Sequence, residues 1–196
     1  MKPAPRLAVL VSGSGRSLEN LIKRIAAGTL QAQIVLVISN RADAYALTRA
    51  AQAGIPSEVI DAEKQLDPAA FSARVFAACA AAGAELVVCA GFLRLLMIPA
   101  EFERRVINIH PSLLPAFAGK GFYGDKVHAA VLARGCQYSG CTVHYVTNEY
   151  DAGPILLQRV VEVLPVDDVH ALAARVFAAE CEALPEAITR HFAARG

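Results

Sequence analysis

The chain has 196 residues, of which 55% are hydrophobic, and its 19 basic and 18 acidic residues leave a net charge of +1 at pH 7. This length predicts one domain with a sizeable core. The balanced charge argues against a nucleic-acid-binding surface, and no apolar run approaches the ~20 residues that a membrane-spanning helix needs. No signal-peptide cleavage site precedes the first apolar run, so we expect a cytoplasmic protein that binds neither nucleic acid nor membrane.

The first half of the sequence alternates strands with helices. A continuous apolar run over residues 7–11 is typical of a central parallel strand. Further strands are expected over residues 34–39, 57–60 and 86–90, and helices over residues 18–27, 44–53 and 68–82. Asp67 as N-cap and Pro68 at the first helical position mark the start of the third helix. This alternation predicts an α/β fold with a doubly wound, mostly parallel, Rossmann-like sheet and helices on both faces.

The second half begins with a strand over residues 106–110 that stops at Pro111. A helix follows over residues 125–134, and then two β-branched strands over residues 138–146 and 155–163, which predict an antiparallel edge. The last helix covers residues 169–192, with Asp167 or Asp168 as its cap. We therefore expect a single domain over residues 1–196, with one half over about residues 7–100 and the other over about residues 101–196.

A loop of small residues, 12–17, joins the first strand to the first helix. The free N–H groups of the helix start attract anions, and glycines at positions 13 and 15 let the backbone approach a phosphate closely. Arg16 and Ser17 add donors. The third glycine of the dinucleotide fingerprint and the Walker pattern are both missing, so this loop predicts a monophosphate site. An ordinary tight strand–helix turn is the alternative.

Asn108 and His110 share one face of their strand because side chains alternate at period two. Pro111 ends the strand, which leaves both at its carboxyl end, where open α/β sheets bind ligands. Asp151 lies in a turn, residues 147–154, that is rich in residues that interrupt helices and strands. A carboxylate near His110 is expected to raise the imidazole pKa and to orient the ring. A cationic His beside an amide suits stabilisation of an oxyanion on a carbonyl under attack, although a polar strand end is the simpler alternative.

Other kinds of site fit less well. Ser14 lacks the glycine two positions earlier that a serine-hydrolase elbow needs. The five cysteines form no CxxC pair, so reduced and mostly buried thiols are expected. The histidines show no metal-ligand spacing, so no metal site is predicted. His144 is interpreted as a supporting or structural residue, and His170 and His191 as ordinary helix residues.

Several motifs, in order along the chain, resemble the phosphoribosylglycinamide formyltransferase family. The resemblance runs from about Leu7 to Glu186. Its motifs are Ser12-Gly13-Ser14-Gly15, Ser39-Asn40-Arg41-Ala42-Asp43-Ala44, Gly91-Phe92-Leu93-Arg94, Asn108-Ile109-His110-Pro111-Ser112-Leu113-Leu114-Pro115, Gly140-Cys141-Thr142-Val143-His144-Tyr145-Val146 and Asp151-Ala152-Gly153-Pro154-Ile155-Leu156-Leu157-Gln158.

This resemblance implies transfer of a formyl group from 10-formyltetrahydrofolate, as co-substrate, to the glycyl amine of glycinamide ribonucleotide in purine synthesis. It implies three catalytic residues: Asn108, His110 and Asp151. The residues implied to bind the ribonucleotide are Gly15, Arg16, Ser17 and Glu180. Those implied to bind the folate are Leu93, Arg94, Leu95, Leu96, Asn108 and Thr147, with residues 147–151 as a folate-side loop. The first half would then bind the ribonucleotide phosphate, and the second would hold the catalytic and folate sites, in a monomer or homodimer.

Three positions depart from the family pattern. The phosphate loop is commonly Gly-Ser-Asn-Leu in the family, and here it is Gly15-Arg16-Ser17-Leu18. Some members have a folate-contacting Arg at the position of Pro68. A His is usual at the position of Cys181. Related enzymes fit less well. A methionyl-tRNA formyltransferase would need an added C-terminal domain, and a formyltetrahydrofolate deformylase an N-terminal one, whereas the first strand begins near Leu7. A non-catalytic nucleotide-monophosphate binding module is the remaining alternative.

Overall fold

The computed structural model describes residues 3–61 and 67–194. In chain order its elements are β1 (Arg6–Val11), α1 (Arg16–Ala26), β2 (Gln33–Ser39), α2 (Tyr45–Gln52), β3 (Ser57–Val59), α3 (Pro68–Ala81), β4 (Leu86–Cys89), the 3-10 helix η1 (Ala100–Phe102), β5 (Val106–His110), α4 (Asp125–Ala133), β6 (Tyr138–Tyr145), β7 (Ile155–Glu162) and α5 (Val169–Ala193). The strands form one seven-stranded sheet in the order β3-β2-β1-β4-β5-β6-β7. The predicted α/β class is confirmed, and the expected elements are found with ends shifted by two residues at most.

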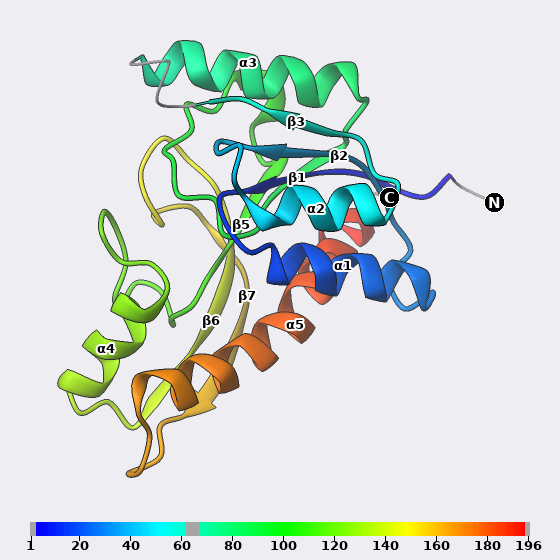
Figure 1. The fold of residues 1–196 in the computed structure, drawn as a ribbon. Helices are drawn as coiled ribbons and strands as arrows, with labels where there is room; N and C mark the ends of the chain where they lie inside the picture. The colour runs from blue at the N-terminus through cyan, green and yellow to red at the C-terminus, as the bar shows by residue number, and fades with distance from the viewer. Residues whose placement is uncertain (1–2, 62–66, 195–196) are drawn as a thin grey trace. The chain divides into compact units, whose positions relative to one another are not determined.

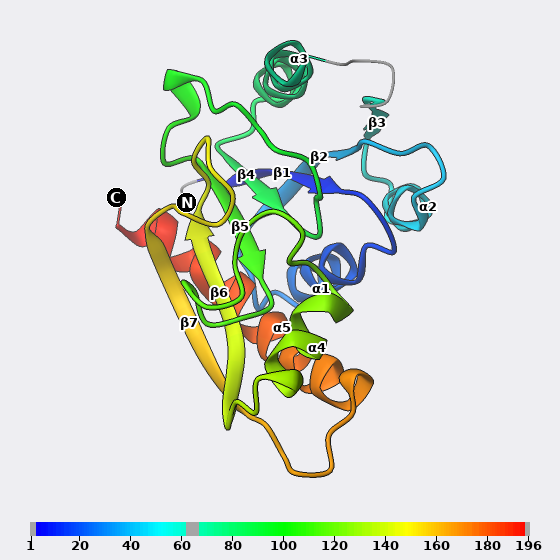
Figure 2. The same cartoon turned by 90° about the vertical axis from the view of Figure 1, so that its left-hand side faces the viewer.

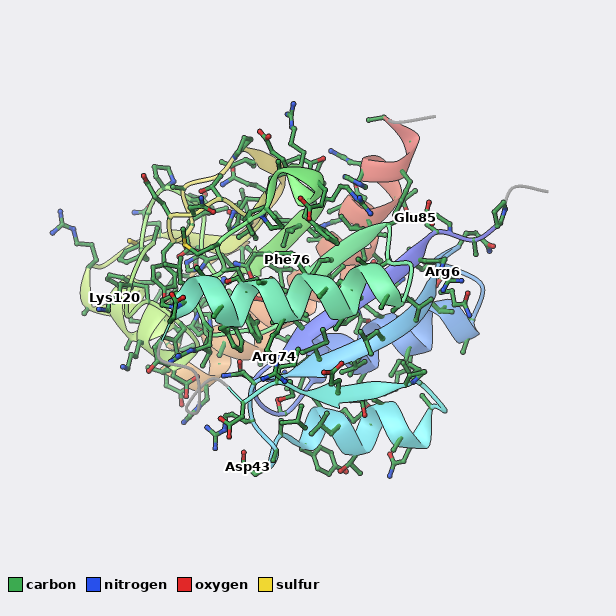
Figure 3. The ribbon with its side chains drawn as sticks, turned by 90° about the horizontal axis from the view of Figure 1, so that it is seen from above. Arg6, Asp43, Arg74, Phe76, Glu85 and Lys120 are labelled. Atoms are coloured by element: carbon green, nitrogen blue, oxygen red, sulfur yellow. The ribbon has the colours of Figure 1, made fainter. Side chains whose placement is uncertain are left out.

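Residues 1–107 form one compact unit around β1. β1 pairs in parallel with β2 and with β4, and Leu7 to Val11 are fully buried. Helices α1 and α2 cover one face of this part of the sheet, and α3 covers the other (Figure 1). Figure 3 looks onto α3 and labels Arg6 and Glu85 near the start of β1, where Glu85 Oε2 accepts the Arg6 N–H at 2.9 Å. The doubly wound arrangement follows from the continuous apolar run of β1, which needs cover on both faces.

Residues 108–196 form the second unit. Strands β6 and β7 pair in antiparallel register, with Thr142 opposite Gln158, so the predicted antiparallel edge is confirmed. Helix α5 packs against this pair and against α4 (Figure 2). It buries an apolar stripe that includes Leu172, Val176 and Leu184. β7 is the last strand of the sheet.

The helix starts have identifiable caps. The Asp67 carboxylate accepts the N–H groups of Ala69 and Ala70 at the start of α3, with Pro68 in the first turn, as predicted. At α5 the cap is Asp168, whose Oδ1 accepts the Ala171 N–H at 2.7 Å. Asp167 forms an ion pair with Arg175 instead. This contact keeps the pKa of Asp167 at about 2, because Arg175 stabilises the charged carboxylate.

The segment between β4 and β5 contains residues 93–96, which were predicted to bind the folate. In the described chain it contains a single 3-10 helix, η1. The N–H of Met97 donates to the Ser72 hydroxyl of α3 at 2.9 Å, so a tertiary contact holds this backbone. None of the helices in the described residues is long and apolar enough to cross a membrane.

Candidate active site

Four side chains from β5, β6 and the turn after β6 form a polar cluster in the second unit. Asn108 Nδ2 lies 3.1 Å from His144 Nε2. Asp151 lies between the two histidines, with Oδ1 3.6 Å from His144 Nε2 and Oδ2 3.6 Å from His110 Nδ1. The side chains of His110 and Asp151 are only 5% and 11% exposed. The structure therefore brings together the three predicted catalytic residues and adds His144, expected to be a supporting residue, as the group that joins two of them.

The turn that carries Asp151 is fixed by its neighbours. Asp151 has a φ of 53°, in the left-handed region that Asp tolerates better than most residues. A Cβ on Gly153 would overlap the carbonyl oxygen of Tyr145, so only glycine lets the turn close against β6. The Gly119 N–H then donates to Asp151 Oδ2 at 2.9 Å, which ties the carboxylate to the loop before α4.

Backbone carbonyls fix which nitrogen of each ring carries a proton. His110 Nε2 donates to the Phe117 carbonyl at 2.9 Å, because a carbonyl can only accept. The other nitrogen, Nδ1, faces Asp151. His144 Nδ1 donates to the Tyr145 carbonyl at 3.0 Å, so its Nε2 accepts from the Asn108 amide. One N–H of Asn108 is then used, and the other remains available to a bound carbonyl oxygen.

Burial has a larger effect on the His110 pKa than the increase predicted from Asp151, which is also present. Burial lowers the His110 pKa, and although the Asp151 carboxylate and the Phe117 carbonyl raise it, the net shift is downward. His110 is therefore neutral at rest near pH 7, not cationic. Burial also raises the pKa of Asp151, but His144, His110 and the Gly119 N–H together lower it below its ordinary value. The cluster at neutral pH is thus a carboxylate beside a neutral imidazole.

Hydrogen bonds from β6 and β7 hold the segment after His110 in place. The Thr142 hydroxyl donates to the Ser112 carbonyl at 2.7 Å and accepts the Leu114 N–H at 3.0 Å. Gln158 Nε2 donates to both Thr142 Oγ1 and the Leu114 carbonyl at 3.0 Å. No role was predicted for Thr142 and Gln158. Period-two alternation with His144 is the signal that could have placed Thr142 on the same strand face.

The predicted phosphate loop lies in the first unit. Gly15 is the N-cap of α1, with φ 70°. Arg16 and Ser17 are the first residues of the helix, the former exposed and the latter half-buried. The carbonyl of Gly13 accepts the Ala46 N–H at 3.1 Å, and the carbonyl of Ser14 accepts Arg49 Nε at 2.9 Å. Residues of helix α2 therefore bind two carbonyl groups of the loop.

The remaining predicted contacts are spread over both units. Leu93 and Arg94 are exposed, Leu95 is half-buried and Leu96 is buried. Thr147 is half-buried beside the turn of Asp151. Glu180 lies on α5, where its charge adds to the effect of burial in raising the pKa of Cys141 to about 12.

Two groups of residues bear on the alternative sites. The Cys79 and Cys89 thiols are buried as expected, and burial raises the pKa of each to about 12, which leaves poor nucleophiles. Over residues 3–61 and 67–194, no three His, Cys, Asp or Glu side chains are arranged to hold a metal ion. His191 is not an ordinary helix residue, because it is 2% exposed and its Nδ1 lies 3.1 Å from the Tyr145 hydroxyl.

Residues 5–188 match the model of the formyl transferase family. The chain belongs to the formyl transferase family. Its resemblance to phosphoribosylglycinamide formyltransferase is confirmed by solved structures. Glycinamide ribonucleotide transformylase 1 from Symbiobacterium toebii is 40% identical, with a TM-score of 0.89 over 96% of this formyl transferase and 87% of that chain. Phosphoribosylglycinamide formyltransferase from Brucella melitensis is 38% identical, with a TM-score of 0.85 over 97% and 96% of the two chains.

Curated relatives of this formyl transferase are longer. The trifunctional purine biosynthetic protein adenosine-3 of Gallus gallus is 42% identical over 185 residues, which are 93% of this chain and 18% of that protein. The chloroplastic phosphoribosylglycinamide formyltransferase of Vigna unguiculata is 40% identical over 193 residues, 93% of this chain and 59% of that one. The formyl transferase described here thus spans about a sixth to three fifths of these proteins.

Proposed function

We propose that this formyl transferase transfers a formyl group from 10-formyltetrahydrofolate to the glycyl amine of glycinamide ribonucleotide. The observation that carries the proposal is the cluster of Asn108, His110, His144 and Asp151, which combines an amide donor with an imidazole and a carboxylate. The names of the similar solved structures and curated relatives support the choice of substrates. The location in purine synthesis follows from the same names.

The cluster suits attack by an amine on a formyl carbon. When the amine nitrogen bonds to that carbon, negative charge develops on the formyl oxygen, and the second N–H of Asn108 is available to stabilise it. The amine nitrogen must lose a proton, and the neutral His110 can accept it at Nδ1. The resulting imidazolium lies 3.6 Å from the ionised Asp151, which stabilises it.

The new proton on His110 completes the reaction. The imidazolium N–H adds a second donor for the oxyanion and can then protonate the folate nitrogen as its bond to the formyl carbon breaks. The formyl group ends on the amine and the proton on the leaving nitrogen, so atoms and charges balance. His110 is thus a base that becomes an acid, and the low resting pKa of a buried imidazole suits the first of these steps.

Substrate contacts are proposed by position. We infer that Gly15, Arg16 and Ser17 bind the ribonucleotide phosphate and that Glu180 contacts its ribose. The folate is proposed to lie against Leu93, Arg94, Leu95 and Leu96, with Asn108 and Thr147 at its reacting end. The exposed Leu93 side chain supports this, because it offers apolar surface to a flat ring. A cytoplasmic enzyme that acts as a monomer or homodimer, without a metal, completes the proposal.

The test is an assay of folate-dependent formylation with glycinamide ribonucleotide as acceptor. The wild-type protein should form formylglycinamide ribonucleotide, and His110→Ala should lose on the order of 10²–10³-fold in turnover, the loss expected when a group that stabilises charge is removed. Formate release without the ribonucleotide would favour the deformylase alternative. Binding of the ribonucleotide without any turnover would favour a non-catalytic binding module.

A further inference from the structure

The hydroxyl of Ser12 joins three loops at the carboxyl ends of β1, β2 and β4. It donates to Asn40 Oδ1, after β2, at 2.6 Å, and it accepts the Leu93 N–H, after β4, at 3.0 Å. The Ser12 N–H also donates to the Gly91 carbonyl at 3.1 Å. Ser12 and Asn40 are 6% and 9% exposed. One buried hydroxyl therefore fixes the peptide group that begins the segment from Leu93 to Leu96.

The rest of the predicted phosphate loop, residues 13–17, is held by different residues. Its Gly13 and Ser14 carbonyls are bound by the Ala46 N–H and by Arg49 of α2. Arg49 is itself fixed, because its NH1 lies 2.6 Å from Glu19 Oε2 of α1. The hydrogen bonds that orient the phosphate loop thus come from α2, whereas those of Ser12 lead to the segment after β4.

We propose that Ser12, although it is the first residue of the loop 12–17, is a positioning residue for the folate-binding segment after β4 and not for the phosphate-binding residues 13–17 that follow it. The proposal rests on the function proposed above. Without the hydroxyl, the Leu93 N–H and Asn40 Oδ1 lose their shared partner. Asn40 is 9% exposed, and an unsatisfied buried group costs about 1–3 kcal/mol. The Leu93 peptide group is then no longer tied by this hydroxyl to the end of β1, so the segment that begins at Leu93 is less firmly placed.

Two variants separate the two loops. Ser12→Ala should raise the KM for 10-formyltetrahydrofolate by about 5- to 150-fold, the range that corresponds to the free energy of such a lost hydrogen bond. Its KM for glycinamide ribonucleotide should stay within about 2-fold, because the α2 contacts remain. Arg49→Met, the matched control, should do the reverse. A Ser12→Ala variant that raises the KM for the ribonucleotide alone, or both constants equally, overturns the proposal.

Hydrogen exchange gives a readout that does not depend on activity. In Ser12→Ala the amides of residues 91–96 should exchange faster than in the wild type, whereas those of residues 13–17 should not. Arg49→Met should show the opposite pattern. Unchanged exchange over residues 91–96 would overturn the assignment of Ser12 even if the KM values moved.

Failure of the wild-type assay would instead contradict the proposed function and leave the exchange result to decide the role of Ser12. If Ser12→Ala does not fold, Asn40→Ala supplies the same test. It removes the acceptor that orients the Ser12 hydroxyl, so the same shifts should occur with smaller size, and their absence overturns the proposal.

Discussion

The Asp151→Asn variant isolates the charge of Asp151 from its role in the turn. Asn adopts left-handed backbone conformations as readily as Asp, so the φ of 53° at this position is retained. The amide oxygen can still accept the Gly119 N–H that now binds Oδ2 at 2.9 Å. The variant therefore removes one negative charge 3.6 Å from His110 Nδ1 and changes little else.

The size of the effect follows from that separation. Unit charges about 4 Å apart interact by about 1 kcal/mol at the dielectric constant of water and by about 4 kcal/mol at an effective value near 20. One pKa unit corresponds to about 1.4 kcal/mol, so the His110 pKa should fall by about 1 to 3 units below its value in the wild type. If the imidazolium forms during the reaction, the same energy is lost from the transition state, and turnover should fall by about 10- to 10³-fold.

Two measurements check this reasoning. The His110 pKa is followed by NMR titration of the ring in both proteins, and turnover is measured at saturating substrates. Asp125→Asn is the matched control, because Asp125 raises the pKa of His128 but is not among the groups that act on His110. If Asp151 only forms a turn, Asp151→Asn will keep nearly full turnover and an unchanged His110 pKa, and the proposed role of its charge is refuted.

Three further outcomes are expected. Arg16→Ala should raise the KM for the ribonucleotide and leave that for the folate nearly unchanged, and steady-state kinetics showing a change only for the folate would contradict a phosphate site at this helix start. Gly15→Ala should lower the free energy of unfolding by about 1–3 kcal/mol, because φ is 70° and the new Cβ would lie 2.6 Å from Ala46 Cβ. Urea titration measures this, and an unchanged urea midpoint of unfolding would contradict it. Burial lowers the pKa of His128, so the unfolded chain binds its proton at a higher pH than the folded one. The free energy of unfolding should therefore fall as the pH drops below about 6.5, and His128→Gln should weaken this pH dependence. A free energy of unfolding that rises on acidification would contradict the expected direction.

The order of strands and helices could be read from the sequence because local signals agreed with the fold. Some patterns depend only on neighbouring residues. Examples are the apolar run of residues 7–11, which predicts a buried strand, and the Asp67-Pro68 pair, which predicts a helix start. The conformation of the segment between β4 and β5 could not be read in this way. The Met97 N–H donates to the Ser72 hydroxyl of α3, a contact between residues 25 apart that no local pattern shows.

The candidate site was predictable in its members but not in its electrostatics. Asn108, His110 and Asp151 stand at strand ends and turns, which a sequence shows. The direction of the His110 pKa shift depends on whether burial or the Asp151 carboxylate has the larger effect. The burial of a side chain at a strand end cannot be read from the spacing of residues in the sequence. The link from Asn108 to His144 spans 36 residues and became visible only with the register of β6.

The backbone around His110 shows why the proton chemistry is assigned to one nitrogen. Among the described residues, only Arg104, Phe117 and Asp151 have positive φ without being glycine, and the last two both lie beside His110. A left-handed conformation costs of order 1–2 kcal/mol for a residue such as Phe, so the surrounding structure must hold it. The backbone of Phe117 in this conformation places its carbonyl where it accepts the N–H of His110 Nε2, and this hydrogen bond keeps the proton on Nε2. Nδ1 is then the only ring nitrogen that can gain and lose a proton, and it faces the carboxylate that stabilises the charged form.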